Sequence, residues 1–371
     1  MKNKWQQIIP GLLYGVMGAV CAKIMLTAMG GTERFLPVLA ATMAILAAAV
    51  LVQLILHEAG HLVFGLLSGY KFSSFRIFSL MWIREEGKLR LRKLSLAGTA
   101  GQCLMAPPDL VNGDMPVVLY NMGGCLMNLL TALVFGLLAL APGGQPVVSG
   151  CLWVFAVTGV CLALVNGLPL HIGPVDNDGC NTRSLRKSPR ARAAFWSQMK
   201  VAEAETRGLR LRDMPEEWFR FPSDEEMKNS IVAVEGVFAC NRLMDQERFD
   251  EADREMERIL ALDSGIVDLH RRLLLCDRIY LELLGENRAE VLAGFLDAPQ
   301  QKLMRQMRGY LPVLRTEYAL ALLRDRDGAK AQKLKEQFEK AAKTYPYPND
   351  VQSERELLEA AEARSREAAS E

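Results

Sequence analysis

The sequence predicts an all-α polytopic membrane protein with a soluble α-helical domain at its C-terminal end, and the distribution of charge is the main reason. The 371-residue chain is 50% hydrophobic and 23% charged overall. Residues 1–180 contain only 19 charged side chains, whereas residues 181–371 contain 68. Because about a quarter of the residues in an ordinary soluble domain are charged, we expect a membrane domain at residues 1–180 and a soluble domain at residues 181–371.

Four stretches of the first part are long and apolar enough to cross a bilayer, which takes about 20 mostly apolar residues of helix. We predict transmembrane helices at residues 8–29, 36–67, 116–140 and 147–170. Basic residues precede the first span, separate the second from the third and follow the fourth, whereas the other two loops contain only Arg34. Since basic loops stay in the cytoplasm, we expect a multi-pass protein of a bacterial cell membrane with both termini cytoplasmic.

Residues 72–96, between the second and third spans, alternate between apolar and charged side chains. Leu89 and Leu91 lie between basic residues at positions 88, 90 and 92, and the preceding turn sequence contains Gly87. Alternation beside such a turn is typical of a β-hairpin. We therefore expect a small hairpin at the cytoplasmic surface of the membrane.

The soluble part shows apolar residues at the three- and four-residue spacing of amphipathic helices. Such segments lie at residues 231–244, 249–262, 267–284 and 310–323. Their lengths resemble those of tetratricopeptide-like repeats, but a clean 34-residue self-match is missing, so an irregular helical bundle stays open as the alternative. Basic and acidic residues are nearly balanced, which argues against a nucleic-acid partner and leaves a protein partner of the helical domain as the expectation.

The most informative motif is His57-Glu58-Ala59-Gly60-His61, near the end of the second span. On a helix, His57 and His61 share one face, and each can give a ring nitrogen to the same zinc ion. Glu58 can then take a proton from a water molecule at the metal. Ionisable groups are costly inside a membrane and are usually functional, so we predict a metal site here, with zinc (Zn2+) as the expected ion.

A catalytic zinc ion has three protein ligands and an open position, so one more ligand is required. The fourth span ends at a polar segment in which Pro169 and Pro174 interrupt the helix, and this allows a side chain to turn back towards the site. His171, Asp176 and Asp178 are the chemically suitable candidates. The eight cysteines form no C-x-x-C pair, and we interpret them as reduced thiols that pack as small apolar groups.

Three motifs occur in a characteristic order: H-E-x-x-H at residues 57–61, G-G-x-x-x-N at 123–128, and N-x-x-P at 166–169 followed by D-G at 178–179. In this order the chain resembles the site-2 protease family of intramembrane zinc metalloproteases over roughly residues 36–180. The resemblance implies His57, His61 and Asp178 as the metal ligands, with Asp176 as the alternative to Asp178.

The resemblance also implies roles for residues beyond the metal ligands. Glu58 would be the general base, and Asn128 would be a polar partner for the substrate backbone or the oxyanion. The family is thought to present substrate on a surface sheet, which the hairpin at residues 72–96 could supply.

The function that the resemblance implies is hydrolysis of a peptide bond in or near a transmembrane segment of another membrane protein. The helical domain would recruit or gate the substrate, and the remaining partner would be the lipid bilayer. The alternative is a membrane-anchored helical interaction or scaffold protein with a vestigial or structural metal site. The intact Glu58 counts against this alternative, because a structural zinc site closes all four positions and needs no base.

Overall fold

A computed structural model describes residues 4–30, 35–85, 87–172 and 175–370 of the chain. The described residues are mostly helical, with a small antiparallel sheet. They divide into two compact units, the first formed by residues 1–72 and 100–189 and the second by residues 73–99 and 190–371.

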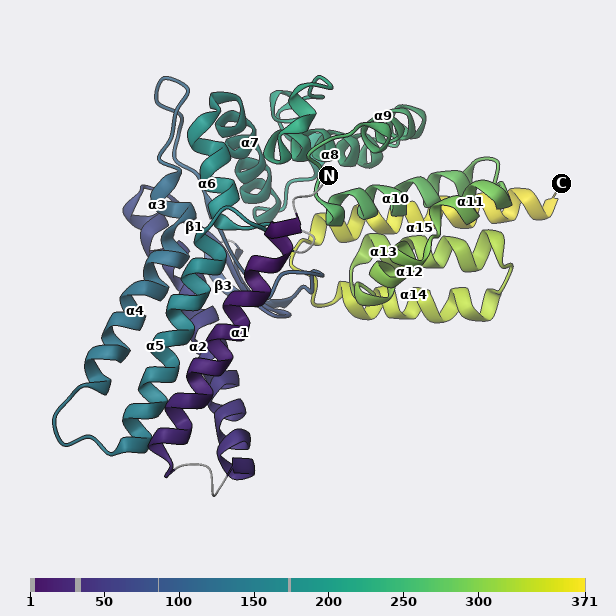
Figure 1. Ribbon diagram of the computed structural model, residues 1–371. Helices are drawn as coiled ribbons and strands as arrows, with labels where there is room; N and C mark the ends of the chain where they lie inside the picture. Colours follow the sequence, from purple (N-terminus) through teal and green to yellow (C-terminus); the bar gives the residue numbers. More distant parts are fainter. Residues whose placement is uncertain (1–3, 31–34, 86, 173–174, 371) are drawn as a thin grey trace. The chain divides into compact units, whose positions relative to one another are not determined.

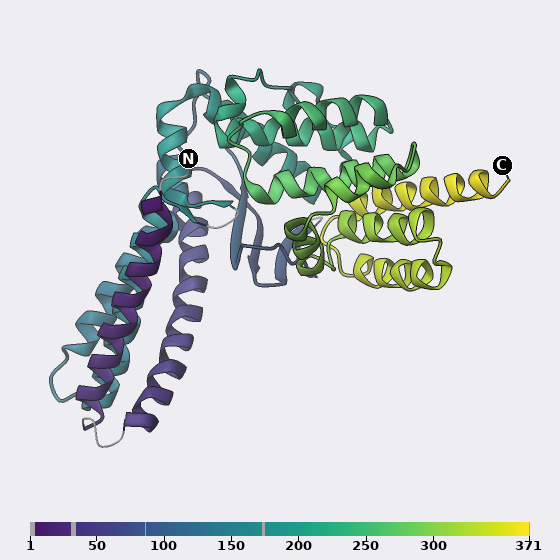
Figure 2. The same ribbon diagram turned by 45° about the vertical axis from the view of Figure 1, so that its right-hand side comes forward.

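The first unit is built on four helices that run side by side in Figure 1 and Figure 2. These are α1 (Lys4–Ala28), α2 (Phe35–Leu67), α4 (Gly123–Ala139) and α5 (Pro146–Gly167). Helix α5 packs against α4, α1 and α2, and α2 also packs against α4. The shorter elements are β4 (Gly101–Ala106), α3 (Val118–Asn121), the paired strands β5 (His171–Ile172) and β6 (Val175–Asp176), and α6 (Asp178–Lys187).

Three helices of this unit are long and apolar enough to cross a membrane: Ile8–Ala28, Phe35–Leu67 and Pro146–Gly167. The third predicted span, at residues 116–140, is divided at Met122 into α3 and the 17-residue α4. At 1.5 Å per residue α4 is about 26 Å long, slightly less than the hydrocarbon core of about 30 Å. The structure thus supports a membrane protein with three helices of membrane length and one shorter apolar helix.

These helices expose apolar side chains and bury polar ones, which is the reverse of a soluble helical bundle. Large apolar residues are exposed, among them Leu36 at 74% and Leu133 at 59%, while Gln53, Asn128 and Thr158 are fully buried. Water would penalise so large an exposed apolar surface, whereas lipid tails would not. The arrangement therefore fits a bilayer as the surrounding solvent.

The small sheet is larger than the predicted two-stranded hairpin. Strands β1 (Lys71–Ile77), β2 (Leu80–Glu85) and β3 (Lys88–Lys93) run antiparallel in sequence order, with Ser74 opposite Ile83 and Trp82 opposite Leu91. The β2–β3 pair is the hairpin expected within residues 72–96. The segment before it is not continuous, because Phe78 has a left-handed backbone conformation with φ of 51° and the chain reverses there.

The sheet is held within the second unit by main-chain and side-chain hydrogen bonds. Lys93 N donates to Thr344 O at 2.8 Å, on the segment before the last helix. Arg76 is 1% exposed, and its guanidinium donates to Phe78 O at 2.7 Å and to Thr99 Oγ1 at 2.6 Å. Residues 73–99 are therefore part of the same compact unit as the C-terminal helices.

The rest of the second unit is helical. Its α-helices are α7 (Pro189–Thr206), α8 (Ser230–Asp245), α9 (Phe249–Ala261), α10 (Asp268–Leu284), α11 (Ala289–Phe295), α12 (Ala298–Gln306), α13 (Leu311–Ala319), α14 (Gly328–Ala342) and α15 (Pro348–Ser370). Helix α13 continues as a π-helix over Leu320–Arg324. The four segments with helical periodicity in the sequence correspond to α8, α9, α10 and α13 with its π-helical extension.

A buried arginine joins three of these helices. Arg315 of α13 has no exposed surface and forms ion pairs with Asp277 of α10 at 2.5 Å and Glu354 of α15 at 3.0 Å. Its guanidinium also lies 4.4 Å from the ring centroid of Tyr280. A buried cation needs such partners, because removing an unpaired charge from water is very costly.

Candidate metal centre

The two histidines of the H-E-x-x-H motif lie on the inner face of α2. His57, Glu58 and His61 are 6%, 7% and 8% exposed. Helix α4 approaches this face at backbone distance: a Cβ added to Gly60 would lie 2.8 Å from the carbonyl carbon of Gly123. Glycines at both positions allow this approach, which brings the side chains of α4 to the histidines.

Hydrogen bonds at Nδ1 fix the orientation of both imidazole rings. His57 Nδ1 lies 2.7 Å from Asn128 Oδ1, and His61 Nδ1 lies 2.9 Å from Tyr120 O. Both partners are oxygen acceptors, so each neutral ring carries its proton on Nδ1 and presents a bare Nε2 lone pair. This is the tautomer that a metal ligand requires.

Asp178 meets the two Nε2 atoms from the start of α6. Its Oδ2 lies 3.1 Å from His57 Nε2 and 3.5 Å from His61 Nε2, and the two Nε2 atoms are 3.2 Å apart. Burial works against the charged carboxyl, but the histidines outweigh it and hold the pKa of Asp178 below its usual range. A proton on one Nε2 atom or a metal cation between the three atoms would satisfy the two lone pairs and the carboxylate oxygen.

The residues beside Asp178 explain why it turns towards the histidines. The Asn177 side chain caps α6 by accepting from Cys180 N at 2.9 Å, and its Nδ2 donates to Val165 O and Leu168 O at the end of α5. A Cβ on Gly179 would lie 2.7 Å from the carbonyl carbon of Leu168. The D-G pair therefore combines the candidate ligand Asp178 with a glycine that lets α6 pack directly on the end of α5.

Of the other two candidates for the third ligand, Asp176 lies in β6, opposite His171 of β5 in the strand register. The group of side chains within the described residues that could hold a metal ion includes Asp178 and does not include Asp176. The side chain of His171 lies outside the described part of the structure.

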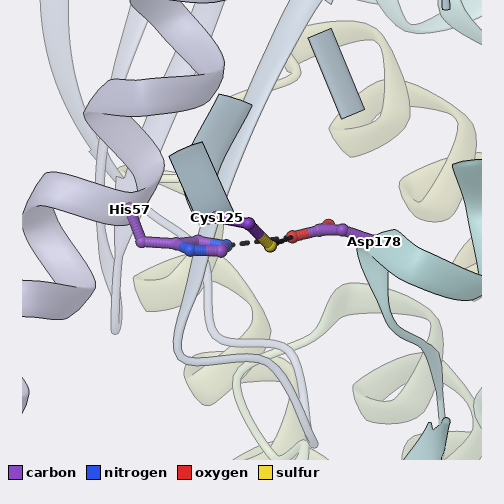
Figure 3. Close-up of side chains that lie close together, drawn as sticks. All are labelled: His57, Cys125 and Asp178. Atoms are coloured by element: carbon purple, nitrogen blue, oxygen red, sulfur yellow. Dashed lines mark hydrogen bonds and ion pairs between the residues drawn. The ribbon is translucent and has the colours of Figure 1, made fainter. Parts of the chain in front are cut away.

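Cys125 of α4 also faces this cluster and was not expected there as a ligand. One donor atom each from His57, Cys125 and Asp178 all lie within 4.8 Å of one another. Figure 3 shows these three side chains. The Cys125 Sγ is 3.9 Å from Asp178 Oδ2. The available signal was its place in the G-G-x-x-x-N segment, three residues before Asn128 and on the same side of the helix.

Asn128 lies at the centre of a fully buried hydrogen-bond network. Its Oδ1 faces His57, and its Nδ2 donates to Gln53 O at 2.9 Å and to Gln53 Oε1 at 2.8 Å. Thr131 Oγ1 also donates to Gln53 Oε1, and Gln53 Nε2 donates to Phe155 O. In this structure Asn128 is a positioning residue for His57, and its contact with a substrate stays a prediction.

Glu58 lies beside the start of β4. A Cβ added to Gly101 would lie 2.6 Å from Glu58 Cγ and 2.7 Å from Glu58 Cδ. The missing side chain at Gly101 therefore makes room for the carboxyl group of Glu58.

The donor set fits zinc. Two imidazole nitrogens and one carboxylate oxygen are the ligands of many catalytic zinc sites, and a carboxylate next to them can act as the base. In a tetrahedral zinc site, ligand atoms about 2.0–2.3 Å from the metal lie roughly 3.3–3.7 Å from each other. The distances of 3.1, 3.2 and 3.5 Å among His57, His61 and Asp178 lie near this range.

Comparison with known proteins adds nothing to this assignment, since no protein-family model, curated protein or solved structure matches the chain.

Proposed function

We propose that this protein is an intramembrane zinc metalloprotease that hydrolyses a peptide bond in or near a transmembrane segment of another protein. The observation that carries the proposal is the convergence of two bare Nε2 atoms and the Asp178 carboxylate at distances of 3.1–3.5 Å. Glu58, which is not part of this ligand set, is buried on the same helix. The same motifs carry the resemblance to the site-2 protease family.

The metal ligands, Glu58 and Asn128 would each have a separate role in the reaction. A zinc ion held by His57, His61 and Asp178 would supply a Lewis acid that makes water acidic enough to attack at neutral pH. Glu58 would accept the proton of the attacking water and pass it to the leaving amine. Asn128 would keep the His57 ring in its ligating tautomer through the bond to Nδ1.

The depth of the motif along α2 agrees with this function. His57 lies 22 residues after Phe35, which is about 33 Å along a helix and close to the thickness of the hydrocarbon core. If α4 crosses the membrane together with the three longer helices, the chain has four spans, and the basic loops and both termini would be cytoplasmic. The site would then lie near the cytoplasmic boundary of the membrane. A substrate helix would have to unwind there, because its carbonyls are tied in backbone hydrogen bonds.

The direct test is cleavage by purified full-length protein in detergent or nanodiscs, together with metal analysis of Glu58→Gln. We expect the variant to keep about one zinc per chain and to lose cleavage, because Glu58 is a base and not a ligand. His57→Ala and Asp178→Ala should lose zinc, whereas Asp176→Ala should keep it. Cleavage by Glu58→Gln, or wild type that takes up no zinc, would refute the proposal.

We further propose that the C-terminal helices, which we continue to describe as tetratricopeptide-like, recruit the substrate through an acidic segment. The support is a cavity of about 600 Å³ lined by α12, α13, the π-helix and α14. Five of its lining residues are basic and one, Glu317, is acidic; the basic ones are Arg305, Arg308, Arg324, Lys330 and Lys333. Arg324 and Lys330 pair with Asp325, and Glu317 attracts Arg308. Basic side chains still outnumber acidic ones in the lining, so an anionic segment would meet a net positive charge.

Charge reversal tests the recruitment role with a matched control. The double variant Arg305→Glu/Lys333→Glu alters the cavity, and Lys302→Glu/Lys340→Glu places the same charge change on exposed positions of the same two helices, outside the cavity lining. We expect only the first to raise KM for a substrate with an acidic cytoplasmic segment, by tenfold or more. Equal KM values for the two variants would refute recruitment through this cavity.

The second candidate function, a membrane-anchored interaction protein with a structural metal site, is favoured by one observation. Cys125 lies with His57 and Asp178 in a group that could hold a metal ion, so together with His61 the chain offers four possible ligands, the number typical of structural zinc sites. If Glu58→Gln and wild type bind zinc equally and neither cleaves any membrane substrate, this candidate is the better one.

A further inference from the structure

Cys125 occupies the side of the metal cluster that the three expected ligands leave open. It is 3% exposed, and its Sγ lies 3.9 Å from Asp178 Oδ2 and within 4.8 Å of a ring nitrogen of His57. Figure 3 shows the thiol between the imidazole and the carboxylate, approaching from α4. A separation of 3.9 Å makes for only a weak S–H···O hydrogen bond, so that bond alone does not account for its place.

The separation between the Cys125 sulfur and the Asp178 carboxylate is close to that of two ligands of one metal ion. A sulfur ligand about 2.3 Å and an oxygen ligand about 2.0–2.2 Å from a zinc ion lie roughly 3.5–3.7 Å apart in a tetrahedron. The 3.9 Å between Sγ and Oδ2 is a few tenths of an ångström longer, and Sγ lies within 4.8 Å of a ring nitrogen of His57. The donor pairs among His57, His61 and Asp178 lie at 3.1–3.5 Å. Cys125 shares a group of possible metal ligands with His57 and Asp178 but not with His61, so its sulfur would have to shift before all four donors could share one ion.

We propose that Cys125 is the fourth metal ligand of the resting protein and must leave the metal before cleavage. On binding, the Sγ–H bond breaks, an Sγ–metal bond forms and the proton passes to water; no electron is transferred. When water takes the position, the thiolate leaves and regains a proton. Its ligand role stands on the geometry alone, and its role as an internal inhibitor rests on the proposed protease function.

The ligand role is tested by spectroscopy on full-length protein whose metal has been exchanged for Co2+. Thiolate bound to Co2+ gives a charge-transfer absorption in the near ultraviolet that nitrogen and oxygen ligands do not give. We expect this band in wild type and in the control Cys161→Ala, which removes another buried thiol of the same unit. Cys125→Ala and Cys125→Ser should lose the band while still binding about one Co2+ per chain.

Two results would overturn the ligand role: wild type that binds Co2+ without the band, or Cys125→Ala that retains it. The first needs no variant, so the proposal can be refuted even if a substitution prevents folding.

Cleavage rates test the inhibitory role separately. If the thiolate leaves the metal only a tenth of the time, its removal raises kcat/KM about tenfold, because activity scales with the competent fraction. A band in wild type with unchanged or lower activity of Cys125→Ala would overturn the inhibitory role. If wild type shows the band but neither wild type nor the variants cleave substrate, the protease function is refuted and the ligand role is kept. If wild type cleaves substrate without showing the band, the ligand role is refuted and the protease function is kept.

Discussion

Gly101→Ala tests the placement of Glu58 without touching a metal ligand or the Glu58 side chain itself. The new Cβ would lie 2.6 Å from Glu58 Cγ and 2.7 Å from Glu58 Cδ, whereas ordinary contacts begin at about 3.4 Å. The carboxyl group therefore has to retreat by roughly 0.7–0.8 Å. No positive φ is found at Gly101, so the alanine adds no left-handed backbone strain.

A displacement of this size should be costly for catalysis and neutral for metal binding. Misplacing a reacting group by about 1 Å can lower a rate by roughly 100-fold, and we expect kcat of Gly101→Ala to fall by about 10- to 100-fold. Zinc content should stay at the wild-type value, because Glu58 is not a ligand.

The assay is cleavage of a membrane substrate by purified protein, with zinc measured on the same samples. Gly15→Ala is the control, since a Cβ at Gly15 meets no atom within 4 Å. If Gly101→Ala keeps wild-type kcat, Glu58 is not the base or does not act from its present position. If it loses zinc, the account of the site as three ligands plus a separate base is wrong.

Three further predictions concern metal affinity, pH and stability. Gly124→Ala places a Cβ 2.5 Å from His57 Cε1 and Nε2, so zinc affinity measured by chelator competition should fall 10- to 100-fold; unchanged affinity would contradict the placement of His57. Burial lowers the pKa of His270 from 6.5 to about 4, so between these pH values the unfolded chain binds more protons than the folded one. The free energy of unfolding therefore falls as the pH drops from 6.5 to 4, by up to about 3 kcal/mol. His270→Leu should flatten this dependence in urea unfolding at pH 7 and pH 4.5, and an equal slope in both proteins would contradict it. Arg315→Met leaves Asp277 and Glu354 without the cation that they pair with. The free energy of unfolding of the second unit should fall by about 3–5 kcal/mol, and a fall below about 1 kcal/mol in urea unfolding would show that the ion pairs are not needed.

The residues of the candidate site that the sequence could predict are those placed by their spacing along one helix. His57 and His61 are four residues apart on one helix, so any helix over this segment places them on one face. Asp178 could be named only together with two alternatives, because its position depends on how Asn177 caps α6 and binds the end of α5. These are tertiary contacts that no periodicity reveals.

The elements that the sequence analysis missed depend on backbone geometry or on contacts between helices. The break at Met122 shortens the third apolar helix although hydropathy continues through it, and the left-handed Phe78 splits one apparent strand into two. Cys125 was interpreted as a packing thiol, since only the close approach of α2 and α4 at Gly60 and Gly123 directs it to the cluster. In each of these three cases the backbone changes the structure at a point where the sequence pattern of apolar and polar residues continues unchanged.

The hydrogen bond between Lys93 and Thr344 has a consequence for synthesis and for the design of shortened proteins. Some 250 residues separate its two ends, so at translation rates of about 5–20 residues per second the strands wait on the order of 12–50 seconds for their partner. During this time β3 presents an open edge to other chains, and its four Lys and Arg side chains at positions 88, 90, 92 and 93 oppose wrong pairing. A protein truncated after residue 189 would keep that edge open permanently, so substitutions in the full chain, and not deletion of the helices, are the sound way to examine the second unit.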